Sequence, residues 1–217
     1  MTLTTQGDVP IHYTLDGSEP TAASPRYTGP VEIGKSARFR ATALREGGEN
    51  ASYSREFAFS KSTGRPAVLN TKPNDSYTFE GASLLVDGYH SRPVFTSGAW
   101  LGYLDEPLDV TIDMGGEQSY RSVELETLAE KGDWIFPPSS VTVWVSDNGT
   151  DFTEVAPVAV PEAKAGDADG IGRYRMQFPE TSARYLKVVA QNAAAIPAWH
   201  PGAGSKGFLF VDEVVVE

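Results

Sequence analysis

Hydrophobic and polar residues alternate along most of this chain, so that every second side chain is apolar. The clearest runs cover residues 11–15, 39–43, 108–114, 141–145 and 174–178. An alternation with a period of two is typical of strands that bury one face. Glycine, proline and asparagine separate the runs, and no segment has a sustained helical period. The pattern predicts an all-β protein built from two antiparallel β-sandwiches.

The alternation weakens at SKSTGRP, residues 60–66, a short polar stretch that contains Gly64 and Pro66. Stretches of this kind often separate domains. We therefore expect two domains, the first over residues 1–61 and the second over residues 66–217. A chain of 217 residues has room for a core in each, although the first domain is small for a sandwich.

The charge balance limits the class of partner. The chain has 18 Lys and Arg residues against 29 Asp and Glu residues, a formal net charge of -11, without a basic block. Clustered Lys and Arg bind phosphate backbones and anionic lipids, so we expect no nucleic-acid partner and no attraction to an anionic membrane. No apolar run approaches the roughly 18 residues of a membrane span, so no membrane insertion is expected. Without cysteine, disulfides and cysteine nucleophiles are excluded.

The segment IHYTLDGSEPTAASPRYTGPV, residues 11–31, holds a histidine, an aspartate and a glutamate, which raises the question of catalysis. Asp16-Gly17 follows an alternating run, and this dipeptide is typical there of a tight reversal of the chain. The prolines that follow interrupt regular structure. No second carboxylate is placed in the sequence to work with Glu19. We interpret the segment as a structural turn rather than a reactive site.

Common catalytic patterns are also missing. The sequence has three histidines, but no G-x-S-x-G, H-E-x-x-H or phosphate-binding G-x-x-x-x-G-K-[ST] motif. Neighbouring residues of a strand point to opposite faces, so the pairs Asp105-Glu106 and Asp212-Glu213 are poorly placed to flank one glycosidic bond. We expect that the chain is not an enzyme by itself.

The run YTLDGSEPTAASPRYTGPVEI is followed by FRATALREGG, and both lie within about residues 1–60. In this order they resemble the small immunoglobulin-like module found near the C-terminus of chitobiases and β-hexosaminidases. The resemblance implies an immunoglobulin-like fold for the first domain, with the role of a spacer.

Residues 66–217 contain, in order, LLVDGYHSRPVFTSGAWLGY, LDVTIDMGG, VTVWVSDNGTDF, ARYLKVVAQN and FLFVDEVVVE. These segments resemble a discoidin-type domain, also called the coagulation factor type C domain, whose fold is a galactose-binding-like jelly roll. GDWIFPPSSVTVWVSDNG and IPAWHPGAGSKGFLFVDEV are more similar still to the version at the end of bacterial family 20 β-N-acetylhexosaminidases.

Together the resemblances imply the C-terminal region of one parent enzyme, a bacterial family 20 glycoside hydrolase. Such enzymes work in a barrel, which needs about 250 residues, and nothing in this sequence corresponds to one. The resemblance implies a periplasmic, cell-surface or secreted protein. The opening MTLTTQGDV lacks the basic start and the apolar stretch of a signal peptide, which fits a fragment of a longer exported chain.

The discoidin-type resemblance also implies a structural cation, Ca²⁺, where the first loop meets the last strand. Its side-chain ligands would be Asp87, Thr96 and Glu213, and carbonyl oxygens near Leu84, His90 and Asp212 would complete the site. Ca²⁺ takes six to eight oxygen ligands at about 2.3–2.6 Å, so few charges are needed. In this sequence YHSRPVF separates Asp87-Gly88 from the threonine. The alternative is that Asp87 makes a turn and Glu213 faces solvent.

Aromatic residues in the loops are candidates for carbohydrate contact, because a sugar ring has an apolar face and its hydroxyls bind polar groups nearby. Loops at one end of a sandwich converge in space although they lie far apart in sequence. The candidates in three such loops are Trp100, Tyr103, Trp134, Phe136, Trp199 and His200. The alternative is that these rings pin long loops onto the sandwich.

The sequence therefore favours a non-catalytic accessory region whose second domain binds carbohydrate. Glycans that contain N-acetylglucosamine or galactose are the expected partners. The main alternative is purely structural: both modules would pack on the catalytic domain of the same parent chain and stabilise it without binding sugar. A third interpretation is adhesion to a protein or lipid surface.

Overall fold

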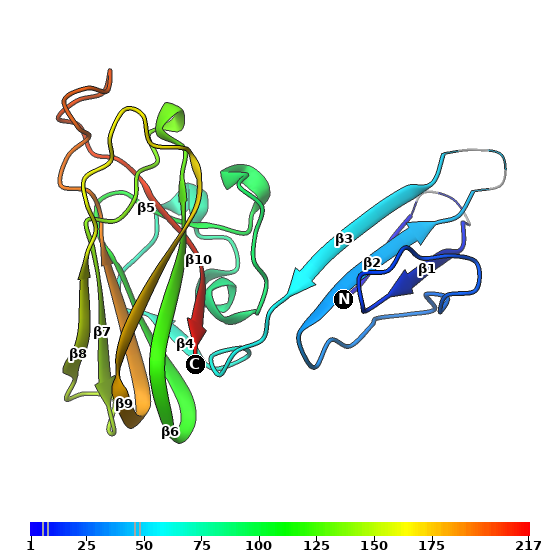
Figure 1. The fold of residues 1–217 in the computed structure, drawn as a ribbon, viewed down its shortest axis with the longest axis horizontal. Coiled ribbons are helices and arrows are strands. Elements are labelled where there is room, and N and C mark those ends of the chain that lie inside the picture. Colours follow the sequence, from blue (N-terminus) through cyan, green and yellow to red (C-terminus); the bar gives the residue numbers. More distant parts are fainter. Residues whose placement is uncertain (6, 8, 46, 48) are drawn as a thin grey trace. The chain divides into compact units, whose positions relative to one another are not determined.

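A computed structural model describes residues 1–5, 7, 9–45, 47 and 49–217. The described residues form two compact units, Met1–Phe59 and Ser60–Glu217. Regular structure in both units is almost entirely β-strand, with a few short 3-10 helices (Figure 1). The expectation of an all-β protein is confirmed. In the described part of the chain, no helix is long and apolar enough to cross a membrane.

The first unit contains one antiparallel sheet in the order β1-β2-β3. Its strands are β1 (Ile11–Thr14), β2 (Ala37–Ala43) and β3 (Ala51–Phe57). Phe39 of the central strand is fully buried, and its ring lies 5.8 Å from the ring of Tyr13 and 6.4 Å from that of Tyr53. These rings from all three strands form the centre of a small core. Among the described residues no second sheet covers this one, so the immunoglobulin-like fold stays a prediction.

The segment after β1 is a turn, as its sequence predicted. The Asp16 Oδ1 atom accepts hydrogen bonds from the Ser18 amide (2.9 Å) and the Ser18 hydroxyl (2.6 Å), which lower the pKa of Asp16. Gly17 has a φ of 85°, a conformation that glycine adopts without strain. The Glu19 carboxylate forms an ion pair with Arg40. The acidic groups of this stretch therefore serve the turn.

The second unit is one continuous antiparallel sheet in the order β5-β10-β6-β9-β7-β8, with β4 paired to β6. Its strands are β4 (Ala67–Leu69), β5 (Leu101–Tyr103), β6 (Leu108–Ala129), β7 (Ser140–Ser146), β8 (Thr153–Ala159), β9 (Gly170–Gln191) and β10 (Leu209–Val216). Short 3-10 helices lie in the connections: η1 (Asp75–Tyr77), η2 (Gly81–Val86), η3 (Phe95–Ser97) and η4 (Lys131–Asp133).

The long strands β6 and β9 take part in both layers of a sandwich. Residues 108–113 of β6 and 185–190 of β9 pair with each other and with β4 and β7 on their outer sides. Register shifts follow between Asp113 and Gln118 and between Tyr120 and Ser122. Beyond them β6 continues beside β10. Bulges bend strands, so the pairing folds one sheet into two facing layers (Figure 1).

The core lies between these layers and confirms the alternation in the sequence. Along residues 108–114 every second side chain is fully buried, and Val141 and Val143 of β7 repeat the pattern. Leu125 and Val214 come from the facing layer and belong to the same apolar cluster. Burying each such side chain contributes about 1.5–3 kcal/mol.

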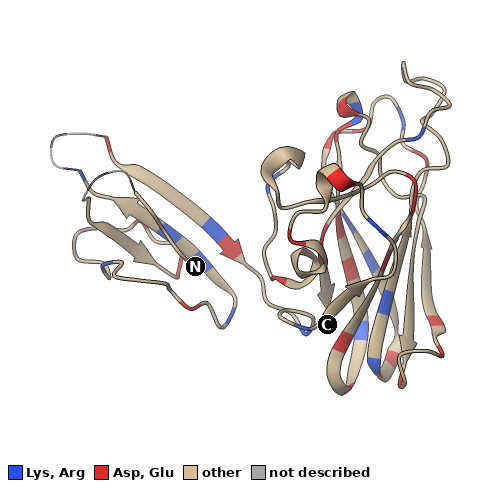
Figure 2. Cartoon of the chain, turned by 180° about the vertical axis from the view of Figure 1, so that it is seen from behind, with Lys and Arg blue, Asp and Glu red and all other residues tan. Residues whose placement is uncertain are grey.

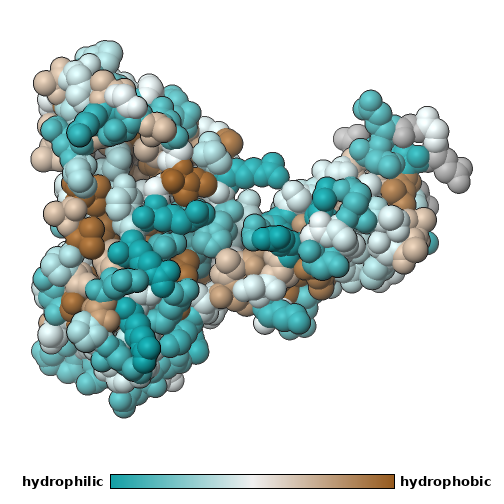
Figure 3. All heavy atoms as spheres, in the orientation of Figure 1, coloured by the Kyte–Doolittle hydropathy of each residue, from teal (hydrophilic) through white to brown (hydrophobic). Residues whose placement is uncertain are grey.

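Charged residues of both signs lie close together along β6 and β9 (Figure 2). Arg173 donates to Glu126 over 2.8 Å, and Arg121 pairs with Glu180 at 2.5 Å. The face of the molecule in Figure 3 likewise has small apolar patches between hydrophilic atoms rather than one continuous apolar surface. The described strands therefore present no obvious binding surface, and we look for the site in the loops.

Candidate functional site

Three loops meet at one end of the second unit: residues 130–139 between β6 and β7, 160–169 between β8 and β9, and 192–208 between β9 and β10. The Ser139 amide donates to the Gln191 carbonyl over 2.8 Å. The Val160 amide in turn donates to the Ser139 carbonyl over 2.9 Å. These hydrogen bonds join the ends of all three loops, as the sandwich geometry led us to expect.

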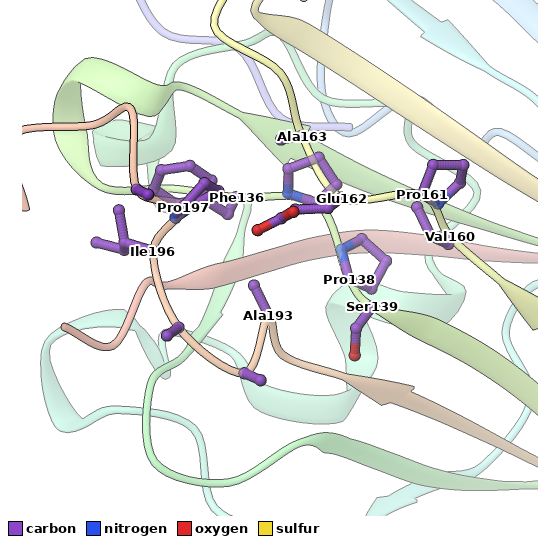
Figure 4. Close-up of a pocket in the computed structure, with 14 residues that line it drawn as sticks. Phe136, Pro138, Ser139, Val160, Pro161, Glu162, Ala163, Ala193, Ile196 and Pro197 are labelled. Atoms are coloured by element: carbon purple, nitrogen blue, oxygen red, sulfur yellow. The ribbon is translucent and has the colours of Figure 1, made fainter. Parts of the chain in front are cut away.

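A pocket of about 380 Å³ opens between the loops, lined by residues 136–139, 160–163 and 193–198 (Figure 4). Prolines and alanines make up most of its wall. Proline fixes its own backbone and has no N–H group, so the four prolines stiffen the wall and add no backbone donor to it. Glu162 is exposed, and its carboxylate points into the pocket in Figure 4. Among the described lining residues it is the only one with a charge.

Trp199 follows Ala198, a residue of the pocket wall, although it is not itself one of the lining residues. Its side chain is 40% exposed, and its Nε1 atom donates to the Ala163 carbonyl oxygen over 3.0 Å. Its ring centroid lies 6.3 Å from that of Phe136. Both of these partners line the pocket. Trp199 therefore combines a fixed orientation with an open surface beside the cavity.

His200 holds the aromatic rings of this region together. Its ring centroid lies 6.0 Å from Trp134, 5.6 Å from Trp199 and 5.4 Å from Phe136. Its Nδ1 atom accepts a hydrogen bond from the Gly202 amide at 3.0 Å, which leaves Nε2 to donate to the Lys131 carbonyl at 2.9 Å. Both nitrogens are engaged with backbone, so His200 supports the rings and, contrary to the sequence hypothesis, has no nitrogen free for a sugar hydroxyl.

Trp134 is the second exposed tryptophan of the region. It adopts a left-handed conformation with φ 63° at the end of η4, and 42% of its surface is exposed. A Cβ atom at Gly202 would lie 2.9 Å from its ring, so the glycine permits close packing there. The structure thus brings Trp134, Phe136, Trp199 and His200 together, with the two tryptophans facing solvent and Phe136 only 1% exposed.

The other two aromatic candidates do not join this cluster. Trp100 and Tyr103 are fully buried, and the Trp100 Nε1 atom donates to the Arg92 carbonyl over 3.0 Å. Trp100 packs in an apolar cluster with Leu128 and Phe210. A ring without exposed surface cannot stack on a sugar, so for Trp100 and Tyr103 the structural alternative replaces the sugar-contact prediction. Their large apolar area favours burial.

The carboxylates suggested for a cation lie in the interior. Glu213 is fully buried, so the alternative that it faces solvent is wrong. Its Oε1 atom accepts from the Gly88 amide at 3.3 Å, and its Oε2 atom has no hydrogen-bond partner among the described residues. Burial, together with the nearby Asp87 and Asp212 carboxylates, raises the pKa of Glu213 to about 10. Burial likewise raises the pKa of Asp212 to about 8.

These groups fit a cation in part. An orphaned carboxylate oxygen beside two further carboxylates is a set of hard oxygen donors of the kind Ca²⁺ binds. Thr96, however, is an exposed residue of η3. Ser91 is the buried hydroxyl residue here, and its amide donates to Asp212 Oδ2 over 2.7 Å. The described residues contain no group of three or more His, Cys, Asp or Glu side chains arranged to hold a metal, so a cation would need backbone carbonyls as well.

Two features were missed in the sequence. Glu162 and the alanine-rich wall of the pocket lie in loops, where periodicity gives no signal. The buried Glu126 joins the partly buried His90 to the exposed Arg173: His90 Nδ1 and Arg173 Nε each lie 2.8 Å from Glu126 Oε2. The hydrogen bond to Glu126 raises the pKa of His90. The three residues come from distant segments, so only the fold brings them together.

Two family models match the sequence. The model described as Fn3 associated matches residues 1–57, and the model of the F5/8 type C domain matches residues 70–206. The second match covers more than half of the chain. The chain therefore belongs to the F5/8 type C domain family. The discoidin-type resemblance is thereby confirmed. No curated protein sequence matches the chain.

Several solved structures are similar to the chain. Chitosan-binding module 1 of a chitosanase/glucanase from Paenibacillus sp. IK-5 is 17% identical with a TM-score of 0.47, over 73% of this chain and 98% of that one. CpGH89CBM32-5 from Clostridium perfringens, in complex with GalNAc-beta-1,3-galactose, is 16% identical with a TM-score of 0.46, over 70% and 93%. A Streptococcus pneumoniae fucose binding module is 22% identical with a TM-score of 0.45, over 73% and 94%.

Proposed function

We propose that the second unit is a carbohydrate-binding module that holds a glycan in the loop pocket, with one sugar face against Trp199. The observation that carries this proposal is the 40% exposed Trp199 ring, which is hydrogen-bonded to Ala163 and contacts Phe136, two residues of the pocket wall. Ligand sites are concave, mostly apolar and supplied with few polar groups, and they occupy roughly 300–1,000 Å³. The pocket has this size and this character.

The rigidity of the site also supports binding. Hydrogen bonds join the three loops at their bases, and the Trp199 indole ties one loop to another. A site that is ordered before its ligand arrives loses less conformational entropy on binding. Proline at positions 137, 138, 161 and 197 adds to this order. Weakly binding sugars are the ligands for which such preorganisation matters most.

At the level of the whole chain, we propose a non-catalytic accessory region of a bacterial β-N-acetylhexosaminidase, secreted or periplasmic. The run YTLDGSEPT in the first unit and the segment GDWIFPP in the second support this parent. The first unit would be an immunoglobulin-like spacer. The second would keep the parent enzyme near its polymer and so raise the local concentration of substrate. Hydrolysis of a chromogenic N-acetylglucosaminide by this chain would contradict the proposal.

The test is affinity electrophoresis and a glycan array with the full chain and two variants. Trp199→Ala removes the indole ring, and we expect at least tenfold weaker glycan binding. Phe79→Ala is the matched control, because Phe79 is also an exposed aromatic loop residue, at 45%, and lies outside the pocket. We expect it to bind like the wild type. Absence of binding by the wild type, or equal binding by Trp199→Ala, would favour the structural role.

We further propose that Ca²⁺ stabilises the second unit. Glu213 and Asp87 would supply carboxylate oxygens, with carbonyl oxygens of the loop before Ser91 completing the shell. The buried Glu213 Oε2 atom without a partner supports this assignment, because a buried unpaired acceptor is costly. Thr96 is left out of this set because it is exposed.

A further inference from the structure

Among the described residues that line the loop pocket, Glu162 is the only charged group. Glu162 forms no ion pair and no side-chain hydrogen bond among the described residues, although Figure 4 shows its carboxylate directed into the cavity. Of the lysines in the three loops, Lys131 pairs with Asp169, and Lys206 pairs with Asp105 at 2.6 Å. Lys164 is exposed in the same loop as Glu162, and in the described part of the chain no ion pair joins the two. The pocket therefore presents a carboxylate that its own loops leave free.

The one side-chain donor of the described wall does not compete for this carboxylate. The Ser139 hydroxyl donates to the Asn192 carbonyl over 2.9 Å, and the prolines of the wall have no amide hydrogen. An ionised carboxylate only accepts hydrogen bonds. An occupant of the pocket must therefore bring the donor, and an occupant with positive charge gains most.

We infer that the pocket selects glycans that carry a free amino group, namely cationic amino sugars, through an ion pair between the sugar ammonium and Glu162. This inference rests on the proposed carbohydrate-binding function and names the ligand class of the same site. Hydrogen bonds between ionised partners are roughly twice as strong as those between neutral groups. The net charge of -11 also favours the approach of a cationic polymer.

The inference separates two related ligands. An N-acetylated sugar has a neutral amide where the amino sugar has an ammonium group. Both sugars have the same ring, so both offer Trp199 the same stacking surface. Measured ion pairs at exposed sites give about 0.2–1 kcal/mol, or up to about a fivefold change in affinity. We expect about threefold or greater preference for the deacetylated form at low ionic strength. Salt should weaken this preference, because the charges are screened.

The experiment is calorimetric titration of the full chain with glucosamine oligomers and with N-acetylglucosamine oligomers of equal length, at mildly acidic pH where the sugar amine is protonated. Glu162→Gln should lose the preference for the deacetylated oligomer and keep its affinity for the acetylated one. Glu154→Gln is the control, because Glu154 is an exposed acid of β8 and lies outside the pocket. It removes the same charge and should keep the preference.

The outcomes distinguish this inference from the proposed function. Equal affinity for both oligomers, with binding that Trp199→Ala still weakens at least tenfold, would overturn the inference and leave the carbohydrate site in place. A preference that Glu162→Gln retains would overturn it as well. Failure of the wild type to bind any glycan would overturn the proposed function and the inference together.

Discussion

The Trp199 indole nitrogen lies 3.0 Å from the Ala163 carbonyl oxygen, so the ring beside the pocket also ties the β9–β10 loop to the β8–β9 loop. One side chain thus has two roles that substitution can separate. Its exposed face would contact the proposed ligand, and its nitrogen fixes the loop that carries Glu162. The loop geometry and the binding surface are therefore coupled through this residue.

Trp199→Phe should separate these roles. Phenylalanine keeps an aromatic ring but has no N–H group, so the hydrogen bond to Ala163 is lost. Such a bond contributes about 0.5–1.5 kcal/mol. We expect a slightly lower melting temperature and a few-fold loss of glycan affinity, against at least tenfold for Trp199→Ala. Thermal melting and calorimetry on both variants measure this, and equal losses of affinity would mean that the hydrogen bond matters more than the ring.

Gly207→Ala should deform the pocket by displacing Phe136, one of its wall residues. A Cβ atom at Gly207 would lie 2.8 Å from the Phe136 ring, which is only 1% exposed and lines the pocket. Overpacking of this kind costs about 1–3 kcal/mol. We expect lower stability and weaker glycan binding, because the ring must move toward the cavity.

Gly132→Ala is the matched control for this change. Gly132 belongs to the same loop end, and nothing lies within 4 Å of a Cβ atom there. Urea unfolding and glycan titration should leave this variant close to the wild type. If Gly207→Ala also behaved like the wild type, Phe136 would not shape the pocket as the structure indicates.

The sequence predicted the strands of the core but not their length. Alternation marked residues 108–114, whereas β6 continues to Ala129 through Gly115 and Gly116. Glycine in a sequence usually ends a strand, but here Gly115, with φ 80°, lies where the register shifts and the strand bends. A long bent strand and two short strands have the same local pattern, because only the pairing with β9 distinguishes them.

The sequence predicted the loops of the site better than its side chains. Trp134 and Trp199 lie in exposed loops, whereas Tyr103 lies in the core, in one apolar cluster with its cross-strand partner Leu209. That burial depends on a segment about 106 residues away in the chain, which no local pattern records. Glu162 was missed for the same reason, because its role follows from the loops that surround it.

The ion pair between Asp113 and Arg184 should make stability depend on acid. Hydrogen bonds from Arg184, with the Gly115 amide, lower the pKa of Asp113 from 3.8 to about 2. A carboxyl group whose pKa is lower in the folded than in the unfolded protein adds to the free energy of unfolding at pH values above the unfolded pKa. This contribution is lost as the pH falls through the folded pKa. The contribution is therefore present at pH 7 and decreases between about pH 4 and pH 2.

Asp113→Asn removes this titration, so its stability should fall less than that of the wild type between those pH values. Urea midpoints at pH 7 and pH 2.5 measure the difference. Asp151→Asn is the control, because Asp151 is an exposed acid that forms no ion pair among the described residues. Equal acid sensitivity of wild type and Asp113→Asn would mean that the pair with Arg184 does not stabilise the fold.

Calcium should stabilise the second unit through Glu213. A ligand at 100 times its dissociation constant adds about 2.7 kcal/mol to the free energy of unfolding, which raises the melting temperature by about 5–10 °C for a domain of this size. Calorimetric scans with EDTA and with Ca²⁺ measure the shift.

Glu213→Gln should abolish this shift in melting temperature, since an amide oxygen lacks the charge, and Asp87→Asn should reduce it. Thr96→Ala should keep the full shift, because Thr96 is exposed on η3. A melting temperature that changes with neither EDTA nor Ca²⁺ would contradict the calcium proposal. Glu213 would then be a protonated residue of the core.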